Sequence, residues 1–455
     1  MNSLDPIFYP GSVAVVGASN NEKKWGYRLL RNIMDGGFRG GIYPVNPGEA
    51  HVQGLPGVPS VKELEGKVEL AVIAVPSQHV LAVVDECGRS GVKGLVVVSA
   101  GFAETGGKGK ELEQELVSLV RDYGMRMIGP NTLGIVNERA SLNASIIGRL
   151  PRQGGISFIT QSGTLGLALA DWAIDMGLGL SKIISTGNKA DTDDVDLLEY
   201  LDRDESTQVV VMYMEGVKRG RLLLESVKRI KKPIVAIKTG RSQQGARAVF
   251  SHTGSMAGSD EVFSAAFRQC GIIRVGTVEC IFDAALALST QPLPAGNSVA
   301  IISNGGGASI VATDECEKRG LVMAELSETT RDRIRQTIPA FASASNPVDT
   351  AGTSTVEVYR IVTEALLQDP GVDSIAALYV HTLLSDALEP AKALAELKSK
   401  YPKPIVACWM GGAGTEAGVE LLKKSGVADY VTPERAIKAL AALVMHREFK
   451  EKVKT

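Results

Sequence analysis

Short runs of aliphatic residues alternate with amphipathic segments of helical length along almost the whole chain. In the first third these runs recur about every 25–30 residues, which is the spacing of parallel strands joined by crossover helices. They are Ser12–Val16, Gly41–Val45, Leu70–Val75, Leu95–Val98 and Met125–Ile128. Because the runs are mostly apolar rather than alternating, they predict strands that are buried on both faces.

Two further series of apolar runs follow. The second contains Ile156–Thr160, Leu180–Ser185, Val209–Met214 and Pro233–Lys238, and the third contains Val299–Ser303, Ser374–Tyr379 and Ile405–Met410. Two stretches interrupt the rhythm, a polar one at Asn137–Gly155 and a proline-rich one at Gln291–Asn297, and both are typical of linkers. The pattern therefore predicts an α/β protein with three domains, at about residues 1–138, 150–290 and 297–455.

Charge and composition exclude several classes of protein. The 455 residues include 49 Lys and Arg against 51 Asp and Glu, a net charge of −2, and no basic block marks a nucleic-acid binder. No apolar run is long enough to span a membrane, and the start of the chain shows no signal peptide, so we expect a cytoplasmic protein without membrane contact. The five cysteines form no CxxC pair, and the five histidines show no zinc spacing, so no metal site is expected.

The first apolar run ends in a turn of small residues, Gly17, Ala18 and Ser19, followed by a helix that we expect to begin near Trp25. Such a turn lets the backbone approach a phosphate at a helix N-terminus, although Gly17 could also serve only as a tight structural turn. A dinucleotide site would need GxGxxG here and an acid after the second strand, where the chain instead has Asn46 and Pro47. These departures disfavour an NAD-dependent dehydrogenase.

The later strand ends of the first domain are also small and polar. They carry Val75, Pro76, Ser99, Gly101, Phe102, Pro130 and Asn131. Open α/β sheets bind ligands at the carboxyl ends of their strands, and these residues include no catalytic acid or base. The first domain is therefore predicted to bind a ligand rather than to perform chemistry.

The second and third domains each begin with a strand, a turn of small residues and a helix start, which makes a faint internal repeat. In the second domain the turn holds Ser162, Gly163 and Thr164, and in the third it holds Gly305, Gly306 and Gly307. Backbone N–H groups at a helix start bind anions, so both turns are candidate phosphate sites. The simpler alternative for the second domain is a helix N-cap formed by Ser162 alone.

The sequence pattern gives one candidate catalytic residue, His252. It lies in a segment of small residues, Ser251–Gly258, that cannot bury much apolar surface, and neutral imidazole attacks phosphorus well near pH 7. The glycine-rich flanks of His252 suggest a mobile loop, with an ordinary surface loop as the alternative.

The first domain resembles the CoA-binding domain of the succinyl-CoA synthetase superfamily, and the branch it resembles most is the NDP-forming acyl-CoA synthetases. In the first domain the similar motifs are Val15–Ser19, Asn46-Pro47, Val75-Pro76, Ser99–Phe102 and Gly129–Asn131. In the rest of the sequence they are Ser162–Thr164, the phosphohistidine loop Ser251–Gly254, Glu215, Asn304–Gly307 and Ser345–Asp349. The resemblance implies a Rossmann-like CoA-binding domain followed by two flavodoxin-like ligase domains with parallel sheets.

The resemblance also implies a reaction and a partner. Phosphate would attack the acyl-CoA thioester, and His252 would take the phosphoryl group from the acyl phosphate and pass it to ADP. Glu215, which follows the run Val209–Met214, would hold the second imidazole N–H of His252, with an ordinary solvent-facing loop acid as the alternative. The sequence has neither a GxxxxGK[ST] loop nor a segment like an ATP-grasp domain. We therefore expect the α subunit of an ADP-forming acyl-CoA synthetase, with acetate as the best single choice of acid. An ATP-grasp β subunit would carry Mg²⁺ with ADP or ATP, in an α2β2 assembly.

One alternative from another class is a non-catalytic module that senses CoA or acyl-CoA, and His252 argues against it. The glycine-rich composition and the near-zero net charge together predict that the anions are held by backbone amides and helix dipoles rather than by a basic surface.

Overall fold

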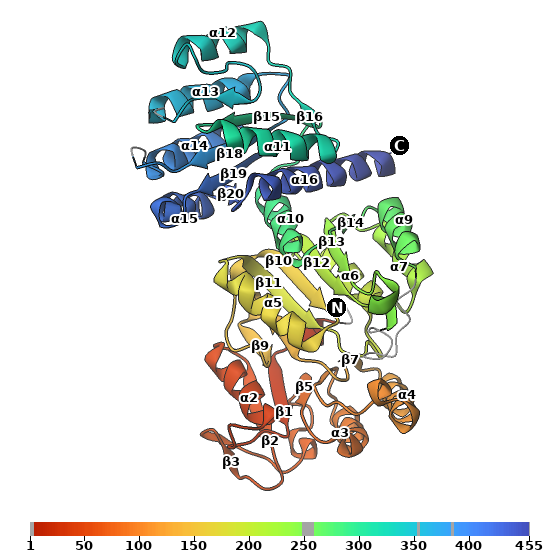
Figure 1. The fold of residues 1–455 in the computed structure, drawn as a ribbon. Coiled ribbons are helices and arrows are strands. Elements are labelled where there is room, and N and C mark those ends of the chain that lie inside the picture. The colour runs from red at the N-terminus through yellow and green to blue at the C-terminus, as the bar shows by residue number, and fades with distance from the viewer. Residues whose placement is uncertain (1–3, 248–258, 353–354, 384–385, 455) are drawn as a thin grey trace. The chain divides into compact units, whose positions relative to one another are not determined.

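The computed structural model describes residues 4–247, 259–352, 355–383 and 386–454. Contacts divide the chain into two compact units, Met1–Arg274 and Val275–Thr455. The first unit contains two large sheets and the second contains one (Figure 1). Parallel strands alternate with helices in both units, so the predicted α/β class is confirmed. Among the described helices, none is long and apolar enough to cross a membrane.

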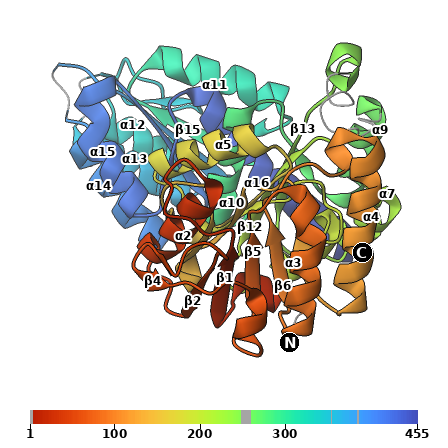
Figure 2. The ribbon, with the colours of Figure 1, turned by 90° about the horizontal axis from the view of Figure 1, so that it is seen from below.

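The first sheet of unit 1 is parallel and has the order β2-β1-β5-β6-β7. Its strands are β1 (Ser12–Val16), β2 (Gly41–Val45), β5 (Leu70–Ile73), β6 (Gly94–Val97) and β7 (Arg126–Ile128), and a small antiparallel pair, β3 (His51–Val52) and β4 (Leu55–Pro56), follows β2. Helix α2 (Trp25–Asp35) covers one face, while α3 (Ser77–Arg89) and α4 (Gly107–Asp122) lie side by side on the other (Figure 2). All five predicted strands of this sheet are confirmed.

The second sheet of unit 1 has the order β14-β13-β12-β10-β11-β8-β9. Its strands are β8 (Gly134–Asn137), β9 (Leu142–Ser145), β10 (Arg152–Thr160), β11 (Gly179–Ser185), β12 (Val209–Met214), β13 (Ile234–Lys238) and β14 (Ile273–Arg274). Its helices are α5 (Gly163–Asp175), α6 (Asp194–Arg203), α7 (Gly220–Val227) and α9 (Asp260–Cys270). Strand order reverses between β10 and β12, so these two strand ends form the switch point where open α/β sheets bind ligands.

The prediction of a linker at Asn137–Gly155 is wrong, because this stretch contains the end of β8, all of β9 and the start of β10. Strand β9 forms an antiparallel pair with β8, and β8 pairs in turn with β11. Two polar residues of this stretch are buried and hydrogen-bonded: Asn137 Nδ2 donates to Phe8 O at 2.7 Å, and Asn143 Nδ2 donates to Ile147 O at 2.9 Å. Buried polar groups with partners do not prevent a strand from joining a core.

A short N-terminal helix, α1 (Asp5–Phe8), fastens the two sheets of unit 1 together. Its residues Ile7 and Phe8 are buried in a core that also includes residues of both sheets. The Phe8 ring stacks on Tyr200 of α6 with centroids 4.9 Å apart, and Tyr200 OH donates to Asp5 Oδ1 at 3.1 Å. Immediately after α1, Tyr9 OH donates to Asp204 Oδ1 at 2.9 Å.

Unit 2 is built around a parallel sheet of order β16-β15-β18-β19-β20, with β17 also paired to β15. The strands are β15 (Ser298–Ser303), β16 (Val322–Met323), β17 (Val348–Asp349), β18 (Ser374–Val380), β19 (Ile405–Met410) and β20 (Ala428–Asp429). One face packs on α10 (Val278–Thr290), α11 (Gly306–Lys318) and α16 (Pro433–Lys454). The other packs on α12 (Glu328–Thr337), α13 (Val356–Gln368), α14 (Leu388–Lys400) and α15 (Glu416–Lys424), which form one row in Figure 1.

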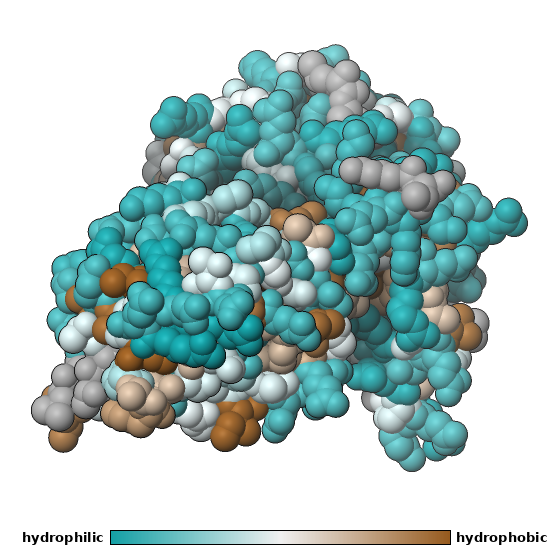
Figure 3. Space-filling view, turned by 90° about the horizontal axis from the view of Figure 1, so that it is seen from above, coloured by the Kyte–Doolittle hydropathy of each residue, from teal (hydrophilic) through white to brown (hydrophobic). Residues whose placement is uncertain are grey.

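The second predicted linker, Gln291–Asn297, is a connection inside unit 2, between α10 and β15. Gln291 holds it in place, because its Nε2 donates to Gly426 O at 2.9 Å and its Oε1 accepts from Ile405 N at 3.2 Å. Helix α10, which the sequence assigned to the second domain, packs against α16 of unit 2. On the face seen in Figure 3, hydrophobic side chains occur singly or in small groups among hydrophilic ones.

Candidate functional site

The turn after β1 brings the backbone of the first sheet close to α2. Gly17 has φ +87°, and a Cβ on this residue would lie 2.5 Å from Ala74 O, so the turn requires glycine. A Cβ on Gly26, in the first turn of α2, would lie only 1.9 Å from Gly17 O. Helix and turn therefore touch through their backbones, and α2 begins at Trp25 as the sequence predicted.

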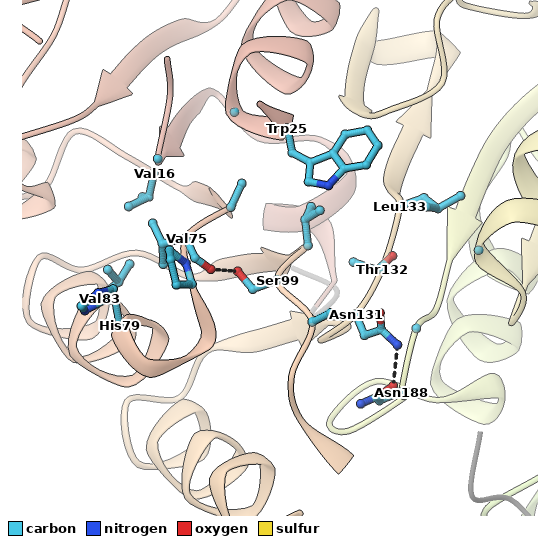
Figure 4. Close-up of a pocket in the computed structure, with 18 of the residues that line it drawn as sticks. Val16, Trp25, Val75, His79, Val83, Ser99, Asn131, Thr132, Leu133 and Asn188 are labelled. Atoms are coloured by element: carbon cyan, nitrogen blue, oxygen red, sulfur yellow. Dashed lines mark hydrogen bonds between the residues drawn. The ribbon is translucent and has the colours of Figure 1, made fainter. Parts of the chain in front are cut away.

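Hydrogen bonds fix the loops that follow the other strands of the first sheet. Ser99 Oγ donates to Val75 O at 2.6 Å, and Asn131 N donates to Ser99 O at 2.9 Å. Asn46 Nδ2 donates to Ala18 O at 2.7 Å, so the loops after β1 and β2 are also joined. Figure 4 shows Val75, Ser99 and Asn131 around the same open space.

This space is a cavity of about 1810 Å³ within unit 1. Sites for drug-sized ligands usually measure about 300–1,000 Å³, so the cavity suits a larger molecule. The predicted residues that line it are Gly17, Ser19, Asn46, Pro47, Val75, Pro76, Ser99, Asn131, Gly163 and Thr164. The first eight follow strands of the first sheet, and the last two begin α5 after β10. The structure thus brings the predicted ligand loops and the first predicted phosphate turn to one cavity.

Six other predicted residues of unit 1 do not line the cavity: Ala18, Gly101, Phe102, Pro130, Ser162 and Glu215. Several of them shape the loops around it. The backbone N–H groups of Gly101 and Phe102 donate to Glu104 Oε1 at 2.6 and 3.1 Å, and Pro130 O accepts from Asn188 N at 2.9 Å. Ala18 and Phe102 are fully buried. These residues are therefore placed to support the cavity rather than to face it.

The start of α5 has the geometry of an anion site. Ser162 is the N-cap residue with an extended backbone, but its side chain makes no capping hydrogen bond. The structure therefore does not support the simpler interpretation, in which the Ser162 side chain caps the helix. The first N–H groups of a helix have no partner within the helix, and here Gly163 and Thr164 carry them toward the cavity.

Glu215 lies directly after β12, at the same edge of the second sheet as the start of α5. It is 5% exposed, and its backbone N–H donates to Gln161 Oε1 at 3.0 Å. Its burial disfavours the alternative of a solvent-facing loop acid, while Gly216, Val217 and Lys218 after it line the cavity. His252 lies outside the described residues.

The motifs in the sequence assigned no role to the charged side chains of the cavity. Lysines line it at positions 23, 24, 110, 189 and 218, together with the carboxylates of Glu86, Glu104 and Glu113. The expectation that anions meet only amides and helix dipoles is therefore incomplete. One signal was available, since Lys23 and Lys24 follow the Gly17 turn closely in the sequence. Desolvation lowers the pKa of Lys218 below its usual value.

Asn188, in the loop after β11, joins the two sheets across the cavity. Its Nδ2 donates to Glu104 Oε2 at 2.5 Å and to Glu113 Oε2 at 2.7 Å, and its Oδ1 accepts from Asn131 Nδ2 at 3.3 Å (Figure 4). Burial alone would raise the pKa of Glu104, but the hydrogen bonds from Asn188 and the backbone outweigh it, and that pKa lies below its usual value. Glu104 is therefore charged at neutral pH and acts as a fixed acceptor.

In unit 2 the second predicted phosphate turn also precedes a helix. Gly305 is the N-cap of α11, which begins at Gly306 and has no side-chain cap. A Cβ on Gly305 would lie 2.9 Å from Val380 Cγ2, whereas one on Gly307 would meet nothing within 4 Å. A side chain at position 305 would therefore press on Val380, whereas one at position 307 would meet open space. Among the described residues, no group of three or more His, Cys, Asp or Glu side chains could hold a metal ion.

Three family models match the chain in the order expected from the resemblance. They are the CoA binding domain at residues 11–138, the succinyl-CoA ligase like flavodoxin domain at 153–288 and the ligase-CoA domain at 299–448. The α subunit of the ADP-forming acetate–CoA ligase I of Pyrococcus furiosus is 44% identical over 460 residues, which cover 99% of each chain. The chain belongs to the ADP-forming acetate–CoA ligase family.

Other members of the acetate–CoA ligase family agree in sequence and structure. Acetate–CoA ligase (ADP-forming) I of Archaeoglobus fulgidus is 40% identical over 455 residues, and the match covers 99% of this protein but only 65% of that longer one. A solved structure of acetyl-coenzyme A synthetase 1 from Ca. Korarchaeum cryptofilum, in complex with phosphate and ADP, has a TM-score of 0.95 and 40% identity. The match covers 100% of this protein and 99% of that one. The predicted family and the CoA-binding and flavodoxin-like fold are confirmed.

Proposed function

We propose that this protein is the α subunit of an ADP-forming acetate–CoA ligase. It would convert acetyl-CoA, ADP and phosphate reversibly to acetate, ATP and CoA. The observation that carries the proposal is the cavity of unit 1, which is lined by strand ends of the CoA-binding sheet and by the start of α5. A thioester bound along the first sheet would then reach an anion bound at Gly163 and Thr164.

CoA is the ligand we assign to the first sheet. Its phosphates would meet the turn at Gly17–Ser19 and the nearby Lys23 and Lys24, which are exposed cationic side chains of the cavity. Its thiol end would lie toward Ser99 and Asn131. Among the other residues predicted from the strand ends, Asn46, Pro47, Val75 and Pro76 would contact CoA, while Gly101, Phe102 and Pro130 would hold the loops that bind it.

Phosphate is the anion we assign to Ser162, Gly163 and Thr164. A phosphate oxygen attacks the thioester carbon, the C–S bond breaks, and acetyl phosphate and free CoA result. His252 then attacks phosphorus and acetate leaves, which gives a phosphohistidine. Glu215 would hold the second imidazole N–H, which fixes the tautomer and favours the cationic phosphoimidazole. Gly305, Gly306 and Gly307 are proposed as further amide donors to phosphate.

The phosphohistidine must still pass its phosphoryl group to ADP. We propose that an ATP-grasp β subunit, which binds the nucleotide with Mg²⁺, receives it within an α2β2 assembly in the cytoplasm. Two facts support a separate partner: the Pyrococcus furiosus relative is named an α subunit, and the match to the longer Archaeoglobus fulgidus relative leaves about a third of that protein uncovered. The three functional domains proposed here are residues 1–138, 150–290 and 297–455.

The test is to incubate the protein with acetyl-CoA and labelled phosphate and to measure the acid-labile label that it retains. Wild type should be labelled, and His252→Asn should not. His51→Asn is the matched control, because His51 is exposed in β3 and does not line the cavity. Binding of CoA without any labelling of wild type would favour the non-catalytic CoA-binding alternative and overturn the proposal.

A further inference from the structure

Gln161 lies between β10 and α5, at the switch point of the second sheet. Its Oε1 accepts three hydrogen bonds, from Glu215 N at 3.0 Å, Gly216 N at 3.1 Å and Lys189 Nζ at 3.1 Å. Lys189 is itself held in place, since its Nζ lies 2.7 and 2.8 Å from the two oxygens of Asp194. One carboxamide oxygen thus ties together the ends of three neighbouring strands, β10, β11 and β12.

These contacts fix which way the carboxamide of Gln161 points. All three partners are donors, so only the oxygen can occupy that position, and the NH₂ group must take the other side. Gln161 lines the cavity together with Gly163 and Thr164. Among the described residues, none accepts a hydrogen bond from Gln161 Nε2. Two N–H donors are therefore held, without a partner among those residues, next to the first turn of α5.

The equivalent residue of unit 2 is used differently. Asn304 holds the same place in the internal repeat, after β15 and before the N-cap of α11. Its Oδ1 accepts from Val380 N at 2.7 Å, and its Nδ2 donates to Val380 O at 2.9 Å. Both ends of Asn304 therefore join β15 to β18. In Gln161 the oxygen alone joins the strands, and the NH₂ group is left for another acceptor.

We propose that Gln161 Nε2 donates a hydrogen bond to the phosphate that binds at the start of α5. This assignment rests on the proposed function and adds a binding residue to it. A neutral carboxamide fixed by three donors supplies its N–H groups without reorganisation, and a hydrogen bond to an anionic oxygen is stronger than one to a neutral oxygen. Gln161 would thus hold phosphate in line with the helix amides.

Gln161→Glu is the sharpest test, because a carboxylate still accepts the three hydrogen bonds but cannot donate any. We expect the phosphate concentration for half-maximal labelling of His252 from acetyl-CoA to rise at least about tenfold. CoA affinity and melting temperature without ligand should stay unchanged. Gln208→Glu is the matched control: Gln208 is exposed just before β12, at the opposite end of that strand, and receives the same added charge.

A second readout separates this inference from the proposed function. Inorganic phosphate should raise the melting temperature of wild type and of Gln208→Glu by more than that of Gln161→Glu, because a ligand that binds the folded state stabilises it. The general stabilisation that phosphate gives as a salt should be the same in all three proteins. If wild type is never labelled but this pattern holds, the function fails and the binding residue stands. An unchanged phosphate dependence in Gln161→Glu, or an equal loss of CoA binding, would overturn the inference.

Discussion

The ammonium group of Lys182 in β11 offers a stringent test of how unit 1 is held together. Its side chain is 0% exposed, and its Nζ lies 2.7 Å from Asp204 Oδ2, 2.8 Å from Ser206 Oγ and 3.1 Å from Tyr9 OH. The same cation lies 5.1 Å from the centroid of the Tyr9 ring. The change Lys182→Met removes the charge and keeps most of the volume.

The expected loss of unfolding free energy comes from the Asp204 carboxylate that remains in the variant. The Asp204 side chain is only 6% exposed, so without Lys182 its carboxylate would be buried without its ion-pair partner. Removing one partner of a buried ion pair costs about 3–5 kcal/mol. The pKa of Asp204 gives a consistent scale: burial alone would raise it, yet hydrogen bonds from Lys182 and Thr207 lower it to about 2. Relative to 3.8, that lowering corresponds to about 2 kcal/mol.

Differential scanning calorimetry measures this cost directly. In domains of 150–250 residues, 1 kcal/mol shifts the melting temperature by about 2–4 °C, so a cost of about 3–5 kcal/mol should lower the transition of unit 1 in Lys182→Met by roughly 6–20 °C. The transition of unit 2 should not move. Lys231→Met is the control, since Lys231 is exposed in the same unit.

Two results would refute this reasoning. A decrease of less than about 2 °C would show that the ion pair contributes little beyond its own desolvation. The double variant Lys182→Met with Asp204→Asn removes the stranded charge as well, so it should melt above the single variant. A double variant that is no more stable would place the cost in lost packing rather than in the unpaired carboxylate.

Three shorter predictions concern other parts of the molecule. The pKa of Asp204 in the folded protein lies below its value in the unfolded chain, so its contribution to stability is present above about pH 4 and is lost as the pH falls toward 2. The melting temperatures of wild type and Lys182→Met should therefore converge in acid. Gly17 has φ +87°, and a Cβ there would lie 2.5 Å from Ala74 O, so Gly17→Val should distort this turn. Titration calorimetry should show CoA binding weakened at least about tenfold, while the circular dichroism spectrum stays that of the wild-type fold. Iodoacetamide at pH 8 should modify the partly exposed Cys280 before Cys87, because burial raises the pKa of the Cys87 thiol to about 12. Peptide mass spectrometry measures the two rates, and equal rates would contradict this prediction.

The sequence predicted the fold well where apolar runs are long and poorly where polar residues are buried. The apolar composition of Val209–Met214 alone predicts a buried strand, and the structure has β12 at that position. Strands β8 and β9 were missed because Asn137 and Asn143 look like linker residues until their hydrogen-bond partners are known. Two-residue strands such as β17 carry no periodic signal that a sequence could show.

The same contrast holds for the candidate site. Glycine turns could be found because a close backbone approach restricts the residue type, as at Gly17. Apart from Lys23 and Lys24, which follow the Gly17 turn, the lysines of the cavity could not be found, because a lysine on a helix or loop looks alike in sequence whether it faces solvent or a ligand. Gln161 was visible only as a member of the repeat, and the direction of its amide depends on Glu215 and Lys189, which are distant in sequence.

The antiparallel strands β8 and β9 have a practical consequence for dissecting this protein. A cut after residue 138 follows the end of the CoA-binding family match, yet it carries β8 away with the first fragment and leaves Lys182, Ile183 and Ile184 of β11 without their neighbours Asn137, Val136 and Ile135. An uncovered strand edge invites pairing with another molecule. Strand β8 therefore belongs structurally to the second sheet although it lies within the CoA-binding family match. A soluble C-terminal fragment should begin before Gly134.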